Sequence, residues 1–289
     1  PFPSGRKSFI TMALSGKTDD LFVPAETSGS PPSMIESAPL LLPPKANARR
    51  PELNPYVKKL ETLPELIIPF VSVYQHRGRW QSRFPTVQPL YLELGAGYGH
   101  FLLDMARRHP ERNFLGLELK YKRVYRGAEK VRDQGLTNIQ FMRFDALILD
   151  QAFMPEELEG VYINFPDPWP KSHHAVKRMV SPQLVTRLEQ LLTIGGQVQL
   201  KSDYEPYREL FPEAFVGSGF EQTGHVADLG AWSRPEENIQ TTYEKRFRKQ
   251  GLPCFFYEFT LRERRRLAPE PSEARTEEAE PLETSGRSD

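Results

Sequence analysis

The stretch PLYLELGAGYG, residues 89–99, predicts a strand that runs directly into a glycine-rich turn. Helical spacing follows at once, in the apolar residues Phe101, Leu102, Met105 and Ala106. Glycines allow the backbone to approach a ligand closely, and the first turn of a helix offers unpaired N–H groups to it. A strand, a glycine turn and a helix in this order are typical of nucleotide-binding α/β proteins, so we expect ligand contacts at Gly95, Gly97 and Gly99.

The residues around this turn restrict the kind of nucleotide. The dinucleotide fingerprint requires a glycine one position after Gly99, where this chain has His100. Glu93 lies inside the strand before the turn, so it would face a ligand that carries positive charge. A nicotinamide-dependent dehydrogenase is one candidate for the class of protein, but it would explain only the glycine turn and Glu118.

Polar residues follow four further predicted strands at or near their carboxyl ends. The strands are residues 113–117, 138–144, 160–163 and 196–201, and the polar residues are Glu118, Asp145, Asn164 and Ser202-Asp203. Open α/β sheets bind ligands at the carboxyl ends of their strands, and Glu118 lies at about the separation from the turn at which an acid binds ribose hydroxyls. An ordinary surface acid is the alternative interpretation of Glu118.

Helical patterns between the strands predict the fold class. Ser181-Pro182 forms an N-cap and first-turn pair before an apolar helix that Gly195-Gly196 ends, and residues 121–132 place their apolar side chains on one face. Alternation of strands and helices indicates a doubly wound, mostly parallel α/β sheet. Apolar runs around Phe220 and at residues 254–259 would add two strands, giving seven strands in a single domain.

The segment from Asn164 to Lys171, NFPDPWPK, is the most informative candidate site. It is a proline-stiffened turn at the end of a predicted strand, and it carries an acid, an aromatic ring and a cation that suit a flat nucleobase. An ordinary Pro-rich turn is the alternative, but three prolines, an acid and an amide in eight residues are unusual for one.

Length and composition limit the class of protein. At 289 residues with 38% hydrophobic content, the chain can bury one sizeable α/β core, and no apolar run approaches the roughly 18 residues that a membrane span needs. Residues 1–44, rich in Pro, Ser and Gly, and the Glu-rich residues 267–289 are predicted to be disordered tails of the domain 45–266. No metal site is expected, because the adjacent His173 and His174 lack the spacing of metal ligands.

The net charge of zero hides an uneven distribution. Residues 1–44 carry a net charge of −1 and residues 267–289 carry −5, so residues 45–266 carry +6. Clusters of Lys and Arg in this basic domain suit a phosphate backbone, although each cluster alone is also compatible with a solvated helix face. The sequence does not distinguish a monomer from a homodimer.

Several motifs in a fixed order resemble the bacterial tRNA (guanine-N7-)-methyltransferases, class I S-adenosylmethionine-dependent enzymes with a Rossmann-like fold. The resemblance spans roughly residues 49–262 and rests on Leu92–Gly99, Leu115–Glu118, Asp145-Ala146, Asn164–Lys171 and Thr241–Glu244. The glycine turn would fit any class I methyltransferase, whereas the NFPDPWPK string is close to diagnostic of this family.

The resemblance implies a function, a cofactor and a set of site residues. The family transfers a methyl group from S-adenosyl-L-methionine to N7 of a guanine in the variable loop of tRNA, which implies a cytoplasmic enzyme with tRNA as its partner and no membrane contact. It implies that Glu93, Glu118 and Asp145 hold the cofactor and that Asp167 lies at the active centre beside the cofactor. The residues that match its substrate positions are Lys171, Asp203, Thr241, Thr242, Tyr243 and Glu244.

The chemistry of this reaction agrees with the residues present. Guanine N7 has an in-plane lone pair and no proton, so its attack on a sulfonium methyl group needs alignment rather than a general base. No nucleophilic side chain is required, and the single cysteine, Cys254, lies in an apolar run where it is expected to pack. A catalytically silent RNA-binding module with the same fold is a third alternative.

Overall fold

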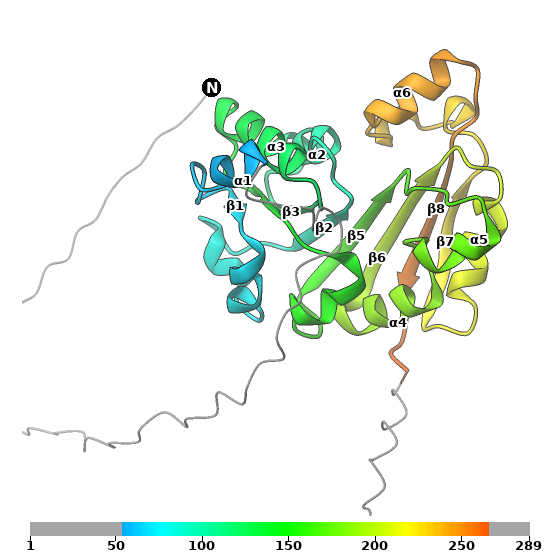
Figure 1. Ribbon diagram of the computed structural model, residues 1–289. Coiled ribbons are helices and arrows are strands. Elements are labelled where there is room, and N and C mark those ends of the chain that lie inside the picture. Colours follow the sequence, from blue (N-terminus) through cyan, green and yellow to red (C-terminus); the bar gives the residue numbers. More distant parts are fainter. Residues whose placement is uncertain (1–53, 266–289) are drawn as a thin grey trace, which may run out of the picture. The chain divides into compact units, whose positions relative to one another are not determined.

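The computed structural model describes residues 54–265, so the predicted tails 1–44 and 267–289 lie outside the described residues. The described chain forms one mixed sheet with helices (Figure 1). Its strands are β1 (Ile67–Ile68), β2 (Leu90–Leu94), β3 (Asn113–Leu117), β4 (Ile139–Met142), β5 (Leu158–Asn164), β6 (Leu192–Ser202), β7 (Phe220–Val226) and β8 (Phe255–Leu261). Its α-helices are α1 (Pro55–Leu60), α2 (His100–Arg108), α3 (Tyr121–Asp133), α4 (Pro182–Leu191), α5 (Tyr207–Phe215) and α6 (Thr242–Lys249). Short 3₁₀ helices span Phe70–His76, Trp80–Arg83, Ala146–Gln151, Ser172–Lys177, Leu229–Ala231 and Pro235–Glu237.

The strand order confirms the doubly wound topology. The order is β1-β4-β3-β2-β5-β6-β8-β7, parallel from β1 to β6 and antiparallel at β8 and its two neighbours. The chain leaves β2 toward β3 and β4 and then returns to β5 on the other side of β2. The topological switch point therefore lies between β2 and β5, where sheets of this kind bind ligands at the strands' carboxyl ends.

The sheet has eight described strands, one more than the seven that the sequence predicts. The additional strand, β1, is only two residues long and pairs Ile67 with Phe141 and Ile68 with Met142. A strand of two residues is too short to show a periodic pattern of apolar and polar side chains. It forms because the edge of β4 is available for pairing. The late strands predicted around Phe220 and at residues 254–259 are present as β7 and β8.

Helices cover both faces of the sheet. The first three helices, α1, α2 and α3, pack on one face around a cluster of buried apolar residues that includes Phe114 and Phe141. On the other face, α4 packs against β6 and α5. The predicted start of α4 is confirmed, since the Ser181 hydroxyl accepts the N–H of Leu184 at 3.3 Å and Pro182 is the first helical residue.

Phe141 explains why glycines occur at three separate places in the sequence. Its ring fills the space beside Gly99 in the turn, Gly116 in β3 and Gly127 in α3, where a Cβ on either of the last two would lie 2.7 Å from the ring. Gly99 also has a φ of 73°, a left-handed conformation that favours glycine. The glycine turn, β3 and α3 are thus packed around one aromatic side chain.

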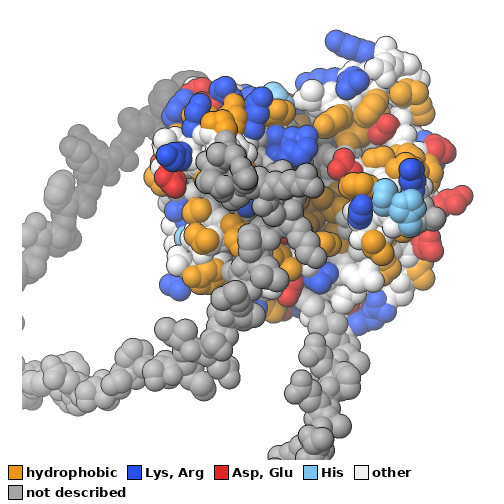
Figure 2. All heavy atoms as spheres, viewed as in Figure 1, with side chains coloured by type: hydrophobic (Ala, Val, Ile, Leu, Met, Phe, Trp, Pro, Cys, Tyr) orange, Lys and Arg blue, Asp and Glu red, His pale blue; other side chains and the backbone are white. Residues whose placement is uncertain are grey.

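The basic side chains of the domain are partly gathered on one side. Lys and Arg side chains occupy the upper part of the view, over α3 and α6 (Figure 2). In Figure 1, α6 lies beyond the carboxyl ends of the parallel strands β5 and β6. No helix within residues 54–265 is both long and apolar enough to cross a lipid bilayer.

Candidate active site

A buried carboxylate and an amide meet at the topological switch point. Glu93 in β2 and Asn164 at the end of β5 lie on neighbouring strands, and Asn164 Nδ2 donates to Glu93 Oε1 at 2.8 Å. Glu93 is 3% exposed, and its second oxygen, Oε2, has no hydrogen-bond partner within the described chain. Burial raises the pKa of Glu93 to about 7, against the opposing effects of Asn164 and Lys201. An unpartnered buried carboxylate oxygen suits a cationic group of a ligand.

The glycine turn after β2 is held in a conformation that only glycine adopts readily. Gly95, Gly97 and Gly99 have φ values of 77°, 58° and 73°. The N–H groups of Gly95 and Ala96 both donate to the carbonyl of Leu117 at the end of β3, at 2.9 Å each. Gly95 is exposed and Gly97 half-buried at the carboxyl edge of the sheet, whereas Gly99 is buried against Phe141.

Glu118 ties this turn to β3 and α3. Its carboxylate accepts the N–H of Gly97 at 3.1 Å and the N–H of Lys120 at 2.9 Å, and Arg123 lies 3.4 Å from it. Only 5% of Glu118 is exposed, so the alternative interpretation as an ordinary surface acid is wrong. A carboxylate offers about four lone-pair sites, which leaves capacity for ligand hydroxyls.

Asp145 follows β4 at the same edge of the sheet. It is half-buried, and its Oδ1 accepts the N–H of Leu147 at 3.0 Å, which caps the 3₁₀ helix Ala146–Gln151. The three predicted cofactor carboxylates, Glu93, Glu118 and Asp145, therefore follow one another along the adjacent strands β2, β3 and β4.

The turn from Asn164 to Lys171 has an unusual backbone that distant contacts hold in place. Phe165 and Trp169 have φ values of 51° and 42°, in the left-handed region that side chains rarely adopt, and each precedes a proline. The N–H of Phe165 donates to the carbonyl of Lys201 at 2.8 Å, and the hydroxyl of Tyr207 donates to the carbonyl of Asp167 at 2.8 Å. Strained backbone that is held in this way is typical of functional sites.

The side chain of Asp167 is left exposed by this arrangement. Within residues 54–265 no hydrogen bond or ion pair engages its carboxylate, in contrast to the capping carboxylates of Asp145 and Asp228. Capping of its own turn would require such a bond. The backbone of Asp167 is therefore fixed while its carboxylate is available to a ligand.

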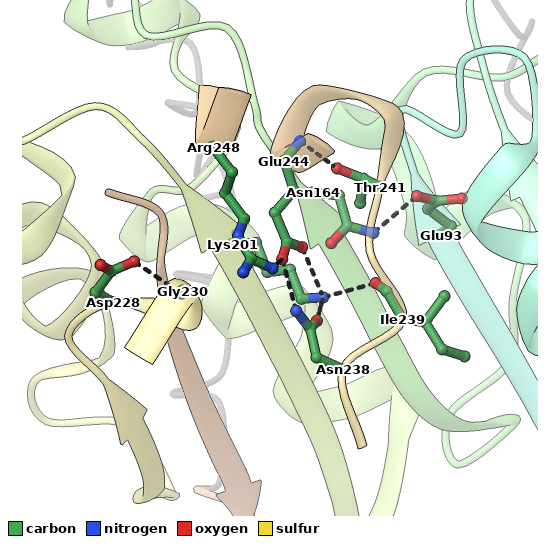
Figure 3. A network of polar contacts seen from close by, with 10 residues as sticks. All are labelled: Glu93, Asn164, Lys201, Asp228, Gly230, Asn238, Ile239, Thr241, Glu244 and Arg248. Atoms are coloured by element: carbon green, nitrogen blue, oxygen red, sulfur yellow. Dashed lines mark hydrogen bonds and ion pairs between the residues drawn. The ribbon is translucent and has the colours of Figure 1, made fainter. Parts of the chain in front are cut away.

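Helix α6 is anchored over this edge of the sheet by a buried ion pair (Figure 3). Lys201 Nζ, at the end of β6, lies 3.6 Å from Glu244 Oε2 and donates to Asn238 Oδ1 at 2.5 Å and to the carbonyl of Ile239 at 2.9 Å. Asn238 Nδ2 in turn donates to Glu244 Oε1 at 2.6 Å. Lys201 is 5% exposed and Glu244 is 0% exposed. Burial lowers the pKa of Lys201, and the carboxylate of Glu244 opposes that shift.

Of the four residues at the start of α6 that the sequence assigns to substrate, two are buried and two are exposed. Thr241 and Glu244 are buried, and the Thr241 hydroxyl accepts the N–H of Glu244 at 3.0 Å, which caps the helix. Thr242 and Tyr243 are exposed. The ring of Tyr243 lies 6.0 Å from that of Phe165, so the outer side of α6 contacts the turn that carries Asp167.

The remaining predicted residues lie around these elements. Lys171 is exposed at the end of the turn, and Asp203 is half-buried after β6, where burial raises its pKa. Burial also raises the pKa of the Cys254 thiol to about 12, as expected of a packed rather than a reactive cysteine. Among residues 54–265 there is no group of His, Cys, Asp and Glu that could hold a metal ion.

Lys201 and Asn238 belong to the site but are not among the residues that the sequence predicts. The signal for Lys201 is its place in β6, where a lysine directly follows buried apolar residues and precedes Ser202 and Asp203. A lysine is almost never fully buried without a partner, so its position implies a carboxylate elsewhere in the chain. The sequence alone offers no means of choosing Glu244 as that carboxylate.

Comparison with known proteins decides the family. A family model described as "Putative methyltransferase" matches residues 87–257, which include the glycine turn, the NFPDPWPK turn and α6. A tRNA (guanine-N(7)-)-methyltransferase of Levilactobacillus brevis is 39% identical over 175 residues, which cover 61% of this chain and 81% of the relative. This chain belongs to the tRNA (guanine-N7-)-methyltransferase family. The family predicted from the sequence is thereby confirmed.

Further relatives give the same result over a larger share of their length. Proteins of the same name from Limosilactobacillus reuteri and Lactiplantibacillus plantarum are 36% and 34% identical, over 89% and 92% of their chains and 66% and 68% of this one. The chain is thus an S-adenosylmethionine-dependent methyltransferase, and the dehydrogenase alternative is not favoured. The roles of the predicted site residues stay predictions.

Proposed function

We propose that this protein transfers the methyl group of S-adenosyl-L-methionine to N7 of a guanine in the variable loop of tRNA. The observation that carries the proposal is the turn Asn164–Lys171, which presents an exposed acid at the switch point of the sheet, next to the glycine turn. Membership of the family supports the same reaction. We further propose that it acts in the cytoplasm, in keeping with a tRNA substrate.

The residues at the switch point fit the cofactor. Glu93 Oε2, buried and without a partner among the described residues, suits the ammonium group of the methionine moiety. Glu118 suits the ribose hydroxyls, Asp145 contributes to the adenosine side, and the open backbone of Gly95 and Gly97 lets the cofactor approach. When bound, S-adenosylmethionine supplies a methyl group on a positively charged sulfur.

The residues of the turn would align the guanine rather than activate it. N7 already has its lone pair, so the barrier depends on the approach and orientation of the base. Asp167 is placed to accept hydrogen bonds from a guanine edge and to stabilise the positive charge that develops on the purine as N7 is alkylated. Lys171, Asp203, Thr242 and Tyr243 are the further residues that we assign to the tRNA, with Thr241 and Glu244 holding α6.

Removal of the Glu118 carboxylate is expected to weaken binding of S-adenosylmethionine about ten- to a hundredfold, a loss of about 1.5–3 kcal/mol. The reason is that Glu118 is proposed to bind the ribose and also holds Gly97 in the turn. Calorimetric titration of Glu118→Ala measures the effect, and Asp133→Ala, which removes an exposed acid from the end of α3, is the matched control. Unchanged affinity in a folded Glu118→Ala protein would refute the assignment.

Cofactor affinity is expected to depend on pH through Glu93, whose pKa burial raises to about 7. Binding of an ammonium group requires the ionised carboxylate, so affinity should rise about tenfold between pH 5.5 and 7. In the cofactor-free protein the free energy of unfolding changes with pH in the opposite direction. The protonated carboxyl of Glu93 favours the folded state below the pKa that this group has in the unfolded chain, and this stabilisation is lost as pH rises through about 7.

Calorimetry at several pH values in this range tests this expectation on the wild-type protein and on Glu93→Gln. The variant should bind more weakly at pH 7 and show a much flatter pH dependence, because its amide does not titrate. An equally steep dependence in Glu93→Gln would assign the titration to another group.

A further inference from the structure

We propose that the pocket between α2, α3 and α6 binds a backbone phosphate of the tRNA. The inference rests on the proposed function, and it adds a binding site that lies beside the residues assigned to cofactor and guanine. The pocket has a volume of about 370 Å³. Its lining includes Asp104 and Arg107 of α2, Lys130 of α3 with Gln134 directly after that helix, and Thr242 and Lys245 of α6.

The charge of this pocket is positive and uncompensated. Arg107 is paired with the only acid in the lining, Asp104, at 2.5 Å. The other two basic side chains, Lys130 and Lys245, form no ion pair with any residue in the range 54–265. An anion bound here would therefore neutralise the charge of these lysines without competing with a carboxylate that is already paired with them.

The contacts of Lys130 show that its cation is held in place rather than extended into solvent. Its Nζ donates to the carbonyl of Tyr98 at 3.1 Å and lies 2.9 Å from His100 Nε2. An ammonium group only donates, so Nε2 accepts and the imidazole is neutral in this contact. Burial lowers the pKa of His100, and the charges of Lys130 and Lys245 lower it further, with Asp104 acting in the opposite direction. A bound anion would oppose the effect of these two charges on His100.

The neutral groups of the pocket are also suited to a phosphate. The Gln134 carbonyl oxygen accepts from Arg107, which leaves the amide N–H groups of Gln134 free to donate. Thr242 and Gln240 offer a hydroxyl and a second amide. Ammonium, hydroxyl and amide donors from three separate elements are the groups that bind phosphate oxygens.

The position of the pocket explains why the anion should come from the tRNA. His100 directly follows Gly99 of the cofactor turn, and Lys245 lies on the helix whose Tyr243 contacts the turn of Asp167. A nucleic acid whose guanine reaches Asp167 brings its negatively charged backbone to this side of α6, and phosphate contacts serve to position such a substrate.

The salt dependence of tRNA binding tests the proposal. Lys130→Met and Lys245→Met should each weaken tRNA binding about tenfold at low salt and reduce the slope of log affinity against log salt by up to about one, because each removes one of the two lysine charges that hold the phosphate. Calorimetry should show unchanged affinity for S-adenosylmethionine in Lys245→Met, whereas Lys130 also donates to the Tyr98 carbonyl in the glycine turn. Lys58→Met, which removes an exposed lysine of α1 outside the pocket, should leave the slope close to that of the wild type.

The outcomes separate this site from the proposed function. Wild-type protein that methylates tRNA, together with pocket variants that keep the wild-type slope, would overturn the phosphate site and leave the function intact. Wild-type protein that neither binds nor methylates tRNA would overturn the function itself. Circular dichroism and thermal unfolding confirm that the variants are folded, and Lys130→Arg, which keeps the charge, should retain most of the binding.

Discussion

Replacing Glu244 by glutamine is expected to lower the free energy of unfolding by about 3–5 kcal/mol. The change keeps the oxygen that accepts from Asn238 and removes the charge, so Lys201 is left as a buried ammonium without its carboxylate. Arg248, which lies 3.7 Å from Glu244 Oε1, loses its partner as well, but its side chain is 34% exposed and can be hydrated. An uncompensated buried charge is costly because the folded protein cannot replace the hydration that the ion loses. Urea denaturation at neutral pH measures the loss.

Two controls identify the buried ion pair as the cause. Glu221→Gln breaks the exposed pair with Arg262, whose side chains are 60% and 57% exposed, and is expected to cost less than about 1 kcal/mol. The double variant Lys201→Met with Glu244→Gln should be more stable than the sum of the single effects predicts, since neither charge is then left unpaired. Strict additivity of the two changes would show that the pair is not coupled.

Asp167→Asn is expected to keep the fold and most of the tRNA affinity but to slow methyl transfer by roughly a hundredfold or more, about 2.7 kcal/mol of transition-state stabilisation. The carboxylate should interact more strongly with the alkylated purine than with free guanine, because positive charge develops on the ring during the reaction. The fixed backbone of Phe165 to Trp169 should be unaffected, since its main-chain groups are held by the carbonyl of Lys201 and the hydroxyl of Tyr207.

Single-turnover assays at saturating cofactor and tRNA measure this rate directly. Asp133→Asn removes a charge from an exposed site on α3 and should react at the wild-type rate. A rate for Asp167→Asn within a few-fold of the wild type would leave Asp167 as part of the turn architecture. The group that stabilises the transition state would then have to be sought at Asn164, Lys171 or Asp203.

The features that could be predicted from the sequence are local in the chain. The strand, glycine turn and helix of residues 89–106 are encoded by adjacent residues, and the same holds for Ser181-Pro182 at the start of α4. The positions of Glu118 and Asp145 follow from one rule, that parallel strands bring their carboxyl ends to one edge. For this reason the sequence predicts both the doubly wound fold and the edge of the sheet at which the candidate site residues lie.

The features that could not be predicted depend on contacts between distant residues. Lys201 and Glu244 meet only because α6 is carried back over β6, and nothing local to either residue indicates the partner. The burial of Glu244 follows from that contact, so one of the residues that the sequence assigns to substrate is a structural carboxylate. The left-handed Phe165 and Trp169 are likewise set by long-range hydrogen bonds and run against the ordinary preference of residues before proline.

Mapping of the methylated nucleoside tests the proposed function most directly. Purified protein is incubated with unmodified bulk tRNA and S-adenosylmethionine labelled in its methyl group, and the tRNA is then digested and its nucleosides and their positions are identified. The predicted result is label in 7-methylguanosine, confined to the variable loop and reduced at least a hundredfold in initial rate with Asp167→Asn. Label in another nucleoside, or tRNA binding without any methyl transfer, would contradict the proposed reaction, and the second outcome would favour a catalytically silent RNA-binding module.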